Sequence, residues 1–265
     1  MNIGIKNAPG ELIILLSTYS FVAEDFINKN PEYINKTNAD CVGGSLQNIG
    51  QSLIGKIIFL SMNLPFGVRN AFFRYSQKEG YVDTVAFGVY RKEIFDKIGF
   101  FNEELVKNQD DKFNYRLQNT GRKIFLTPQI KSSYYSHPSF NTLWRQCYQY
   151  GYWKIMVFQK IKKVSSWRYL TPVIFILWLI TSGLLSLFSK LSILLSILAL
   201  GTYLLRSCIF SVKIVLKEDL RFLPILPVAF SYLHFSYGIG FLHGMIFDFI
   251  IRRKKKTGKE KRFET

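Results

Sequence analysis

The stretch Asn108-Gln-Asp-Asp-Lys-Phe-Asn-Tyr-Arg-Leu117 sets two adjacent carboxylates, Asp110 and Asp111, ahead of two apolar residues, Phe113 and Leu117. The apolar pair is four residues apart, so the stretch predicts a short helix with one buried side. Acidic residues favour the first turn of a helix, because they satisfy free amide donors and face the positive end of the helix dipole. Alone, the pair indicates a helix cap. A small-residue loop before it and an aromatic, glutamine-containing helix after it favour a functional carboxylate.

The chain is basic, and its apolar residues are unevenly spread. It has 265 residues, a formal net charge of +17 and 48% hydrophobic residues. Polar and mixed sequence ends near Ser166, and long apolar runs follow. This division predicts one soluble domain followed by a membrane region. A basic run beside a membrane segment indicates lipid headgroups as partners of the tail at 252–265, so we expect no nucleic-acid partner.

The cysteines and the N-terminus point to a cytosol-facing domain. Cys41, Cys147 and Cys208 are odd in number and far apart, which predicts neither a disulfide framework nor a zinc site. The N-terminus lacks a basic segment followed by an adequate apolar core, so no signal peptide is expected.

Short apolar runs in the first half predict an α/β sheet. Glu11 to Leu16 is an aliphatic run bounded by turn residues, as expected of a strand buried on both faces in a parallel sheet. Ser17, Thr18 and Tyr19 follow at its carboxyl end, the edge where open α/β sheets bind ligands. The other expected elements are a helix at 24–35 interrupted by Pro31, a strand end and turn at 41–44, a helix at 54–62, a strand at 83–91, a helix at 92–98 and a strand at 123–126.

Two features of this half leave alternatives open. Gly88 lies inside a strand, which marks either close approach by a ligand or another backbone, or a simple bulge. The loop from Val68 to Gly80 joins Arg69, Arg74 and Lys78 to aromatic residues. That composition suits an anionic or ring-shaped ligand, but a solvated basic loop is the interpretation favoured without further evidence.

The segment from Asn141 to about Lys163 predicts an amphipathic helix. Gln146, Gln149 and Trp153 fall on one side at spacings of three and four. Its many basic and aromatic residues favour a location at an anionic membrane surface over that of a packed surface helix.

The last third predicts membrane helices at about 169–188 and 191–212, each near the roughly 20 residues that a bilayer core requires. Arg206 is close enough to the end of the second span to snorkel. A third segment, 222–251, contains prolines, histidines and an aspartate. A third crossing would place the basic tail outside, against the positive-inside tendency, so we expect a re-entrant or in-plane pair of helices.

Four motifs in order resemble the family 2 glycosyltransferases, and most of all their membrane-anchored, succinoglycan-biosynthesis type. The motifs are Asn2 to Glu11, Val82 to Lys92, Asn108 to Leu117 and Gln146 to Lys154. The resemblance implies a partial GT-A-like nucleotide-diphospho-sugar transferase domain of α/β class, followed by C-terminal transmembrane helices. The implied parts are this domain at 1–140, an amphipathic interfacial helix at 141–166, a membrane region at 167–251 and a basic tail at 252–265.

The resemblance also implies an activity: transfer of a sugar, with inversion, from a nucleotide-sugar donor to a lipid-linked or glycan acceptor in cell-surface polysaccharide synthesis. Inversion needs a base opposite the leaving diphosphate, and a carboxylate is the usual choice. By resemblance, Asp110 is this base. Gln149 and Trp153 match the family's Gln-x-x-Arg-Trp element, in which Tyr152 replaces the arginine. The implied substrate-binding residues are Asp83, Gly88, Asp111, Gln149 and Trp153.

Two departures from the family pattern affect cofactor and partners. The family binds a divalent cation, Mg²⁺ or Mn²⁺, through an acidic motif, but Ser17, Thr18 and Tyr19 stand there, and such cations prefer carboxylate oxygens. Second, the family's opening strands would precede Leu12 to Leu16, so this apolar edge is expected bare unless a partner chain supplies the missing N-terminal half.

We therefore hypothesise a multi-pass enzyme of the cell membrane, with soluble domain and tail cytoplasmic. The alternative is a truncated, non-catalytic relic or membrane interaction protein.

Overall fold

The computed structural model describes residues 1–265 except 18–19, 50–51, 69–70, 136–138, 162–166 and 261–265. Thr18 and Tyr19 of the expected metal motif thus lie outside the described residues. The elements are α1 (Asn2–Asn7), β1 (Leu12–Ile14), β2 (Ser20–Val22), α2 (Phe26–Thr37), β3 (Cys41–Asn48), α3 (Leu53–Met62), α4 (Phe72–Tyr75), β4 (Gly80–Tyr81), β5 (Ala86–Arg91), α5 (Glu93–Ile98), α6 (Gln109–Asn119), β6 (Ile124–Tyr134), α7 (Phe140–Ile161), η1 (Trp167–Leu170), α8 (Thr171–Leu185), α9 (Lys190–Val215), η2 (Leu220–Phe222) and α10 (Leu226–Glu260).

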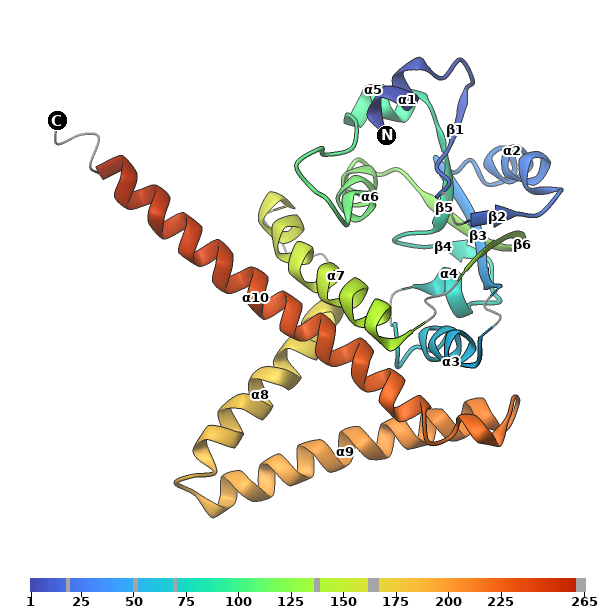
Figure 1. The fold of residues 1–265 in the computed structure, drawn as a ribbon. Helices are drawn as coiled ribbons and strands as arrows, with labels where there is room; N and C mark the ends of the chain where they lie inside the picture. The colour runs from blue at the N-terminus through green and yellow to red at the C-terminus, as the bar shows by residue number, and fades with distance from the viewer. Residues whose placement is uncertain (18–19, 50–51, 69–70, 136–138, 162–166, 261–265) are drawn as a thin grey trace.

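The first half forms a mixed sheet in the order β1-β5-β3-β6-β2, with β4 also beside β6 (Figure 1). Only the β3–β6 pair is parallel among these strands. The expectation that Leu12 to Leu16 is a parallel strand buried on both faces is therefore wrong. β1 lies at the edge, antiparallel to β5, and leaves Ile14 36% and Leu16 50% exposed. An edge position leaves one side of a strand unpaired, as the sequence comparison with the family anticipated.

Helices cover both faces of the sheet. α2 packs Phe26 and Ile34 against Val42, Val89 and other residues of one face. On the other face α5 and α6 build an aromatic core, in which the ring centroids of Phe113 and Phe101 are 4.5 Å apart and those of Phe113 and Phe95 are 4.9 Å apart. The two cores make this half an α/β sandwich, so the mixed α/β class is confirmed.

Pro31 lies within α2 and does not interrupt it, contrary to expectation. Tyr33 and Ile34, which follow the proline, are buried against the sheet. Packing of these side chains accounts for the continuous helix, since tertiary contacts override local propensity.

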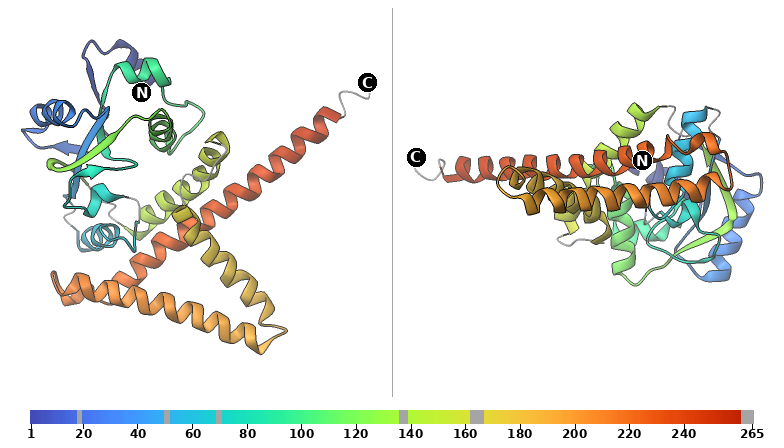
Figure 2. Two further views of the ribbon diagram at one scale, coloured as in Figure 1. Left: turned by 180° about the vertical axis from the view of Figure 1, so that it is seen from behind. Right: turned by 90° about the horizontal axis from the view of Figure 1, so that it is seen from below.

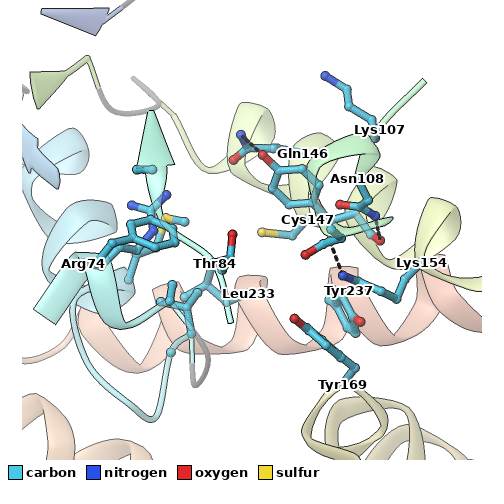
Figure 3. Close-up of a pocket in the computed structure, with 18 of the residues that line it drawn as sticks. Arg74, Thr84, Lys107, Asn108, Gln146, Cys147, Lys154, Tyr169, Leu233 and Tyr237 are labelled. Carbon is cyan, nitrogen blue, oxygen red and sulfur yellow. Dashed lines mark hydrogen bonds and ion pairs between the residues drawn. The ribbon is translucent and has the colours of Figure 1, made fainter. Parts of the chain in front are cut away.

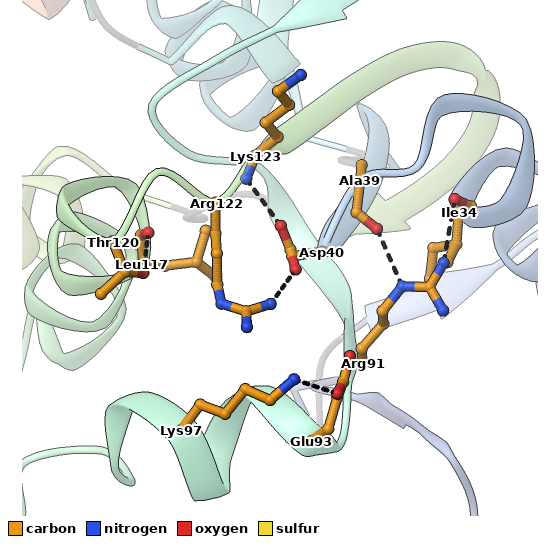
Figure 4. Close-up of polar contacts among 10 residues, drawn as sticks. All are labelled: Ile34, Ala39, Asp40, Arg91, Glu93, Lys97, Leu117, Thr120, Arg122 and Lys123. Carbon is orange, nitrogen blue, oxygen red and sulfur yellow. Dashed lines mark hydrogen bonds and ion pairs between the residues drawn. The ribbon is translucent and has the colours of Figure 1, made fainter.

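Polar contacts join neighbouring strands at the edge of the sheet where β3 and β6 begin and β5 ends (Figure 4). Asp40 accepts hydrogen bonds from the guanidinium of Arg122 and, at 3.0 Å, from the backbone N–H of Lys123. The Arg91 guanidinium donates to the carbonyls of Ala39 and Ile34, each at 3.4 Å. These bonds fix the starts of β3 and β6 against the end of β5.

The second half consists of long helices. α8 and α9 diverge from a tight hairpin, and α10 crosses the open side of the resulting wedge (Figures 1 and 2). By length and composition, α9 is the one described helix able to cross a membrane, and α8 is an apolar helix of 15 residues. Residues 222–251 were expected to form a pair of helices. This expectation is wrong, because α10 is a single helix of 35 residues.

Glycines at the contact between α7 and α10 let the two helices pack closely. A Cβ added at Gly240 would lie 2.1 Å from the carbonyl oxygen of Tyr148, and one at Gly151 would lie 2.0 Å from that of Tyr237. Small residues at both positions let the backbones of α7 and α10 touch. These glycines are thus packing residues. α3 packs Ile57 and Ile58 against this helical layer.

Candidate active site at the sheet–helix junction

α6 is the predicted helix, and its buried face holds its first turn in place. Phe113 and Leu117 have no exposed surface. Asn108 precedes the helix in the left-handed conformation, with φ of 59°, and its side-chain amide donates to the carbonyl of Tyr150 at 3.1 Å. The start of α6 is therefore bound to α7, and Asp110 and Asp111 are presented at the junction.

A cavity of about 2220 Å³ lies at this junction (Figure 3). The sheet domain contributes the end of β1 and the segment from Thr84 to Gly88, and α6 contributes its first turn. α7 contributes a face that includes Gln146, Tyr150 and Lys154. The cavity continues between α8, α9 and α10, so one space joins the carboxylates to the apolar helices.

Asp110 is open to this cavity, and no side-chain partner binds its carboxylate in the described chain. Removal from bulk water, followed by repulsion from Asp111, raises the pKa of Asp110 to about 6, while Lys154 and nearby backbone N–H groups oppose the rise. Asp110 is exposed and lines the cavity, so its carboxyl is accessible although the surrounding protein raises its pKa.

Lys154 is 4% exposed and forms an ion pair with Asp111. Its ammonium also lies 4.0 Å from the ring centroid of Tyr169, an attractive cation–π arrangement. Burial acts to lower the pKa of Lys154, but Asp111 and then the neighbouring tyrosines outweigh it, so the pKa is raised above its usual value. Asp111 is thus occupied by a cation, whereas no described cation forms an ion pair with Asp110.

Arg74 lies across the cavity from Lys154 (Figure 3). Its guanidinium donates to the Tyr134 hydroxyl at 2.7 Å and stands 5.4 Å and 5.6 Å from the ring centroids of Tyr134 and Phe73. None of the described carboxylates pairs with it. Arg74 is therefore a half-buried cation on the cavity wall rather than a fully solvated side chain, and its contact with an anionic ligand stays a prediction. Arg69 lies outside the described residues.

The cavity gathers some of the predicted site residues and not others. Asp110, Asp111, Gly88 and Ser17 line it. Asp83, Gln149 and Trp153 are not among the lining residues, and the first two are exposed elsewhere. Their substrate-binding roles stay predictions.

Close packing accounts for the glycine at position 88. A Cβ there would lie 2.9 Å from the Cys41 sulfur and 3.0 Å from the ring of Tyr90. Gly88 also lines the cavity, and its role in substrate binding stays a prediction.

Several cavity residues were missed from the sequence, notably Thr84, Tyr150 and Lys154. Thr84 follows Asp83 and accepts a 3.0 Å hydrogen bond from the Asn114 amide. Tyr150 and Lys154 are spaced four apart on α7, which was a usable signal, but attention went to the glutamine and tryptophan of the same motif.

The described residues do not suit a divalent cation. No group of three His, Cys, Asp or Glu side chains gathers among them. Ser17 offers only a hydroxyl at the expected position, and Asp111 is engaged by Lys154. We therefore derive no step through a metal.

Comparison with known proteins identifies the relatives. No family model matches the chain. It is 27% identical over 251 residues to a dolichyl N-acetyl-alpha-D-glucosaminyl phosphate 3-beta-D-2,3-diacetamido-2,3-dideoxy-beta-D-glucuronosyltransferase of Methanococcus voltae, covering 92% of this chain and 74% of the relative. It is 21% identical over 234 residues to the succinoglycan biosynthesis protein ExoA of Rhizobium meliloti, covering 88% and 69%.

Two solved structures match the chain at low similarity. The S. aureus TarS 1–349 complex with UDP has a TM-score of 0.35 and 14% identity, covering 91% of this chain and 68% of that one. GalNAc-T7 with UDP, GalNAc and Mn²⁺ has a TM-score of 0.38 and 15% identity, covering 57% and 36%.

The chain is thus related to glycosyltransferases, which confirms the class expected from the sequence. Its relatives are enzymes of polysaccharide and glycolipid biosynthesis.

Proposed function

We propose that this chain is an inverting glycosyltransferase of family 2 type that uses a nucleotide-sugar donor and a lipid-linked or polysaccharide acceptor in cell-surface polysaccharide synthesis. The observation that carries the proposal is the unpaired Asp110 carboxylate, which opens into the cavity and has a pKa of about 6. A base works best when its pKa is near the working pH, because it is then largely ionised yet still proton-seeking. Neither named relative favours the alternative of a non-catalytic relic or interaction protein.

In the proposed step, Asp110 takes the proton from the acceptor hydroxyl. The hydroxyl oxygen then forms a bond to the anomeric carbon of the donor sugar, and the bond from that carbon to the diphosphate breaks on the opposite face. The leaving diphosphate gains negative charge. Arg74 faces the same cavity with free donors and is our candidate to bind that charge.

The ion pair of Lys154 with Asp111 has a supporting role in this scheme. It fixes the first turn of α6 against α7 and places a positive charge near Asp110, which keeps the pKa of Asp110 from rising further. Asp83, Gln149 and Trp153 remain proposed substrate-binding residues outside the cavity lining.

The acceptor is proposed to be membrane-borne. The name of the M. voltae relative specifies a dolichyl N-acetyl-glucosaminyl phosphate, and α9 is long and apolar enough to span a bilayer. We place the sheet domain and the basic tail on the cytoplasmic side of a multi-pass membrane region. The bare edge of β1, where Ile14 is 36% exposed, is where a chain with further strands would add.

The test is a transfer assay on the full chain in nanodiscs. A panel of labelled nucleotide sugars is supplied together with a membrane lipid extract, and label entering the lipid fraction is counted. We expect transfer by the wild type and by Asp96→Asn, which changes an exposed aspartate of α5 outside the cavity. Asp110→Asn is expected to abolish it. If Asp110→Asn transfers sugar at the wild-type rate, Asp110 is not the base. If the wild type transfers sugar from none of the donors in the panel, the proposed function is refuted.

A further inference from the structure

The cavity does not end at the carboxylates but extends into the wedge formed by α8, α9 and α10. α8 contributes the face with Ile174, Phe175 and Trp178, close to where α8 begins. α10 contributes Leu233, His234 and Tyr237 from the side that closes the wedge. Figure 1 shows that the start of α8 lies beside α7, on the side of α7 away from the sheet domain.

α9 presents a single face to this space. Its lining residues are Ala199, Thr202, Tyr203, Arg206 and Phe210, whose spacings of three and four are those of one side of a helix. The wedge is open: Ile174 is 59% and Trp178 45% exposed in it. Most of its surface is aliphatic or aromatic, so it suits a hydrocarbon chain better than a sugar or a nucleotide.

The polar groups at the centre of the wedge are mostly satisfied. The Nε2 of His234 lies 2.8 Å from the carbonyl oxygen of Phe66. A carbonyl only accepts, so this nitrogen carries the proton and Nδ1 accepts from the Tyr203 hydroxyl at 3.0 Å. The ring of Tyr203 also stacks on Phe175, with centroids 4.9 Å apart. Tyr203 is therefore a fixed wall residue rather than a free ligand.

Arg206 is the exception. It is the one charged residue between Lys190 and Lys213 in the sequence of the helix. No carboxylate in the described parts of the chain pairs with it, and its side chain is exposed on the cavity face. An arginine near the end of an apolar span can extend its guanidinium to the level of lipid headgroups, and its planar fork of donors matches phosphate oxygens.

We propose that the wedge binds the lipid part of a phosphate-linked acceptor, with Arg206 on the phosphate, the hydrocarbon chain along α8 and α9, and the saccharide directed toward Asp110. This inference rests on the proposed function and deepens it, because it commits the acceptor to a lipid phosphate rather than a free polysaccharide. It assigns Arg206 as the residue that recognises the acceptor, separate from Arg74 at the donor side of the cavity.

The test is direct binding to the full chain in detergent, read from the fluorescence of Trp178, which lies in the wedge. The probes are a polyprenyl phosphate and the corresponding uncharged polyprenol, and Trp178→Phe identifies the signal. We expect the wild type to bind the phosphate about ten-fold more tightly than the alcohol, as for one charged hydrogen-bonded contact. Arg206→Gln should bring the two affinities together, and Arg206→Lys should keep most of the difference.

Controls separate this site from simple surface attraction and from the reaction. Lys213→Gln changes a cation of the same helix that lies outside the cavity, over the ring of Phe210, and is expected to bind like the wild type. Inorganic phosphate should compete only weakly, because it lacks the chain. The proposal is overturned if the wild type binds the phosphate and the alcohol with equal affinity. It is also overturned if Arg206→Gln keeps the wild-type preference for the phosphate. Binding needs no sugar transfer, so a chain that binds the probe but transfers no sugar refutes only the proposed function.

Discussion

Lys154 of α7 and Asp111 of α6 form an ion pair in which the lysine is almost completely enclosed and the aspartate is less so, with side-chain exposures of 5% and 24%. The pair links the sheet domain to the helical layer at the point where Asp110 enters the cavity. The same two charges act on Asp110 with opposite signs, since Asp111 raises its pKa and Lys154 lowers it. The ion pair that joins the two halves of the chain therefore also influences the pKa of the proposed base.

Removing Asp111 is expected to lower the free energy of unfolding more than removing Lys154. Asp111→Asn leaves an enclosed ammonium without a partner, whereas Lys154→Met leaves a carboxylate that water still reaches. We expect thermal unfolding in detergent to show the larger loss for Asp111→Asn, up to about 3–5 kcal/mol, and about half of that for Lys154→Met. The double variant should recover part of the loss, because both charges are gone. The reverse order of the two single variants would contradict the ion pair as described.

The two variants should also move the pH dependence of transfer in opposite directions. The base is active when deprotonated, so activity of the wild type should rise with pH through about 6. Asp111→Asn removes the like charge and moves this rise to lower pH. Lys154→Met removes the favourable cation and moves it to higher pH. Initial rates from pH 4.5 to 8 measure both, and identical curves would show that neither charge acts on the base.

Asp110→Asn is expected to lose activity without losing stability at neutral pH. The pKa of Asp110 in the folded chain, about 6, is above its ordinary value of 3.8, so the folded state binds the proton more tightly. The wild type therefore loses stability as the pH rises from about 4 to 6, and the amide variant does not. Melting curves at pH 4.5 and 7.5 should show that the stability of the variant relative to the wild type is greater at pH 7.5. A variant that is less stable at pH 7.5 would indicate a structural role for the carboxylate.

Arg74→Gln should weaken donor binding and leave acceptor binding alone. Loss of a charge-assisted contact to the diphosphate is expected to raise the KM for the nucleotide sugar about ten-fold or more. Arg145→Gln, which changes an exposed arginine of α7 outside the cavity, is the matched control. A change in the KM for the acceptor alone would indicate that Arg74 binds the acceptor and not the donor.

Gly151→Ala should separate α7 from α10. The added methyl group would lie 2.0 Å from the Tyr237 carbonyl oxygen, so the backbones must move apart at a cost of about 1–3 kcal/mol. Gly201→Ala in α9 meets no atom within 4 Å and should be neutral or stabilising by up to about 1 kcal/mol, since alanine is the better helix former. Thermal unfolding of the two variants provides the comparison.

The sequence predicted the parts of this fold that depend on local pattern. The spacing of Phe113 and Leu117 was enough to locate α6 and to place Asp110 in its first turn. The position of β1 could not be read in the same way, because pairing with β5 involves residues almost 80 positions away. The single helix α10 was not foreseen, since the contact of Gly240 with Tyr148 of α7 depends on a residue far along the chain.

The candidate site shows the same division. Asp110 and Asp111 came from a motif, but the convergence of Lys154, Arg74 and Arg206 on one cavity depends on how three separate segments fold together. Arg74 in particular was assigned to solvent, because its partner Tyr134 lies 60 residues along the chain.

The most direct test of the central claim is the pH profile of sugar transfer by the wild type and by Asp110→Asn. If Asp110 is the base, the wild-type rate rises through about pH 6, and the variant is slower by about 10²- to 10⁴-fold with no such rise. Asp96→Asn should follow the wild type. A variant that transfers at the wild-type rate, with the same rise near pH 6, would contradict the account.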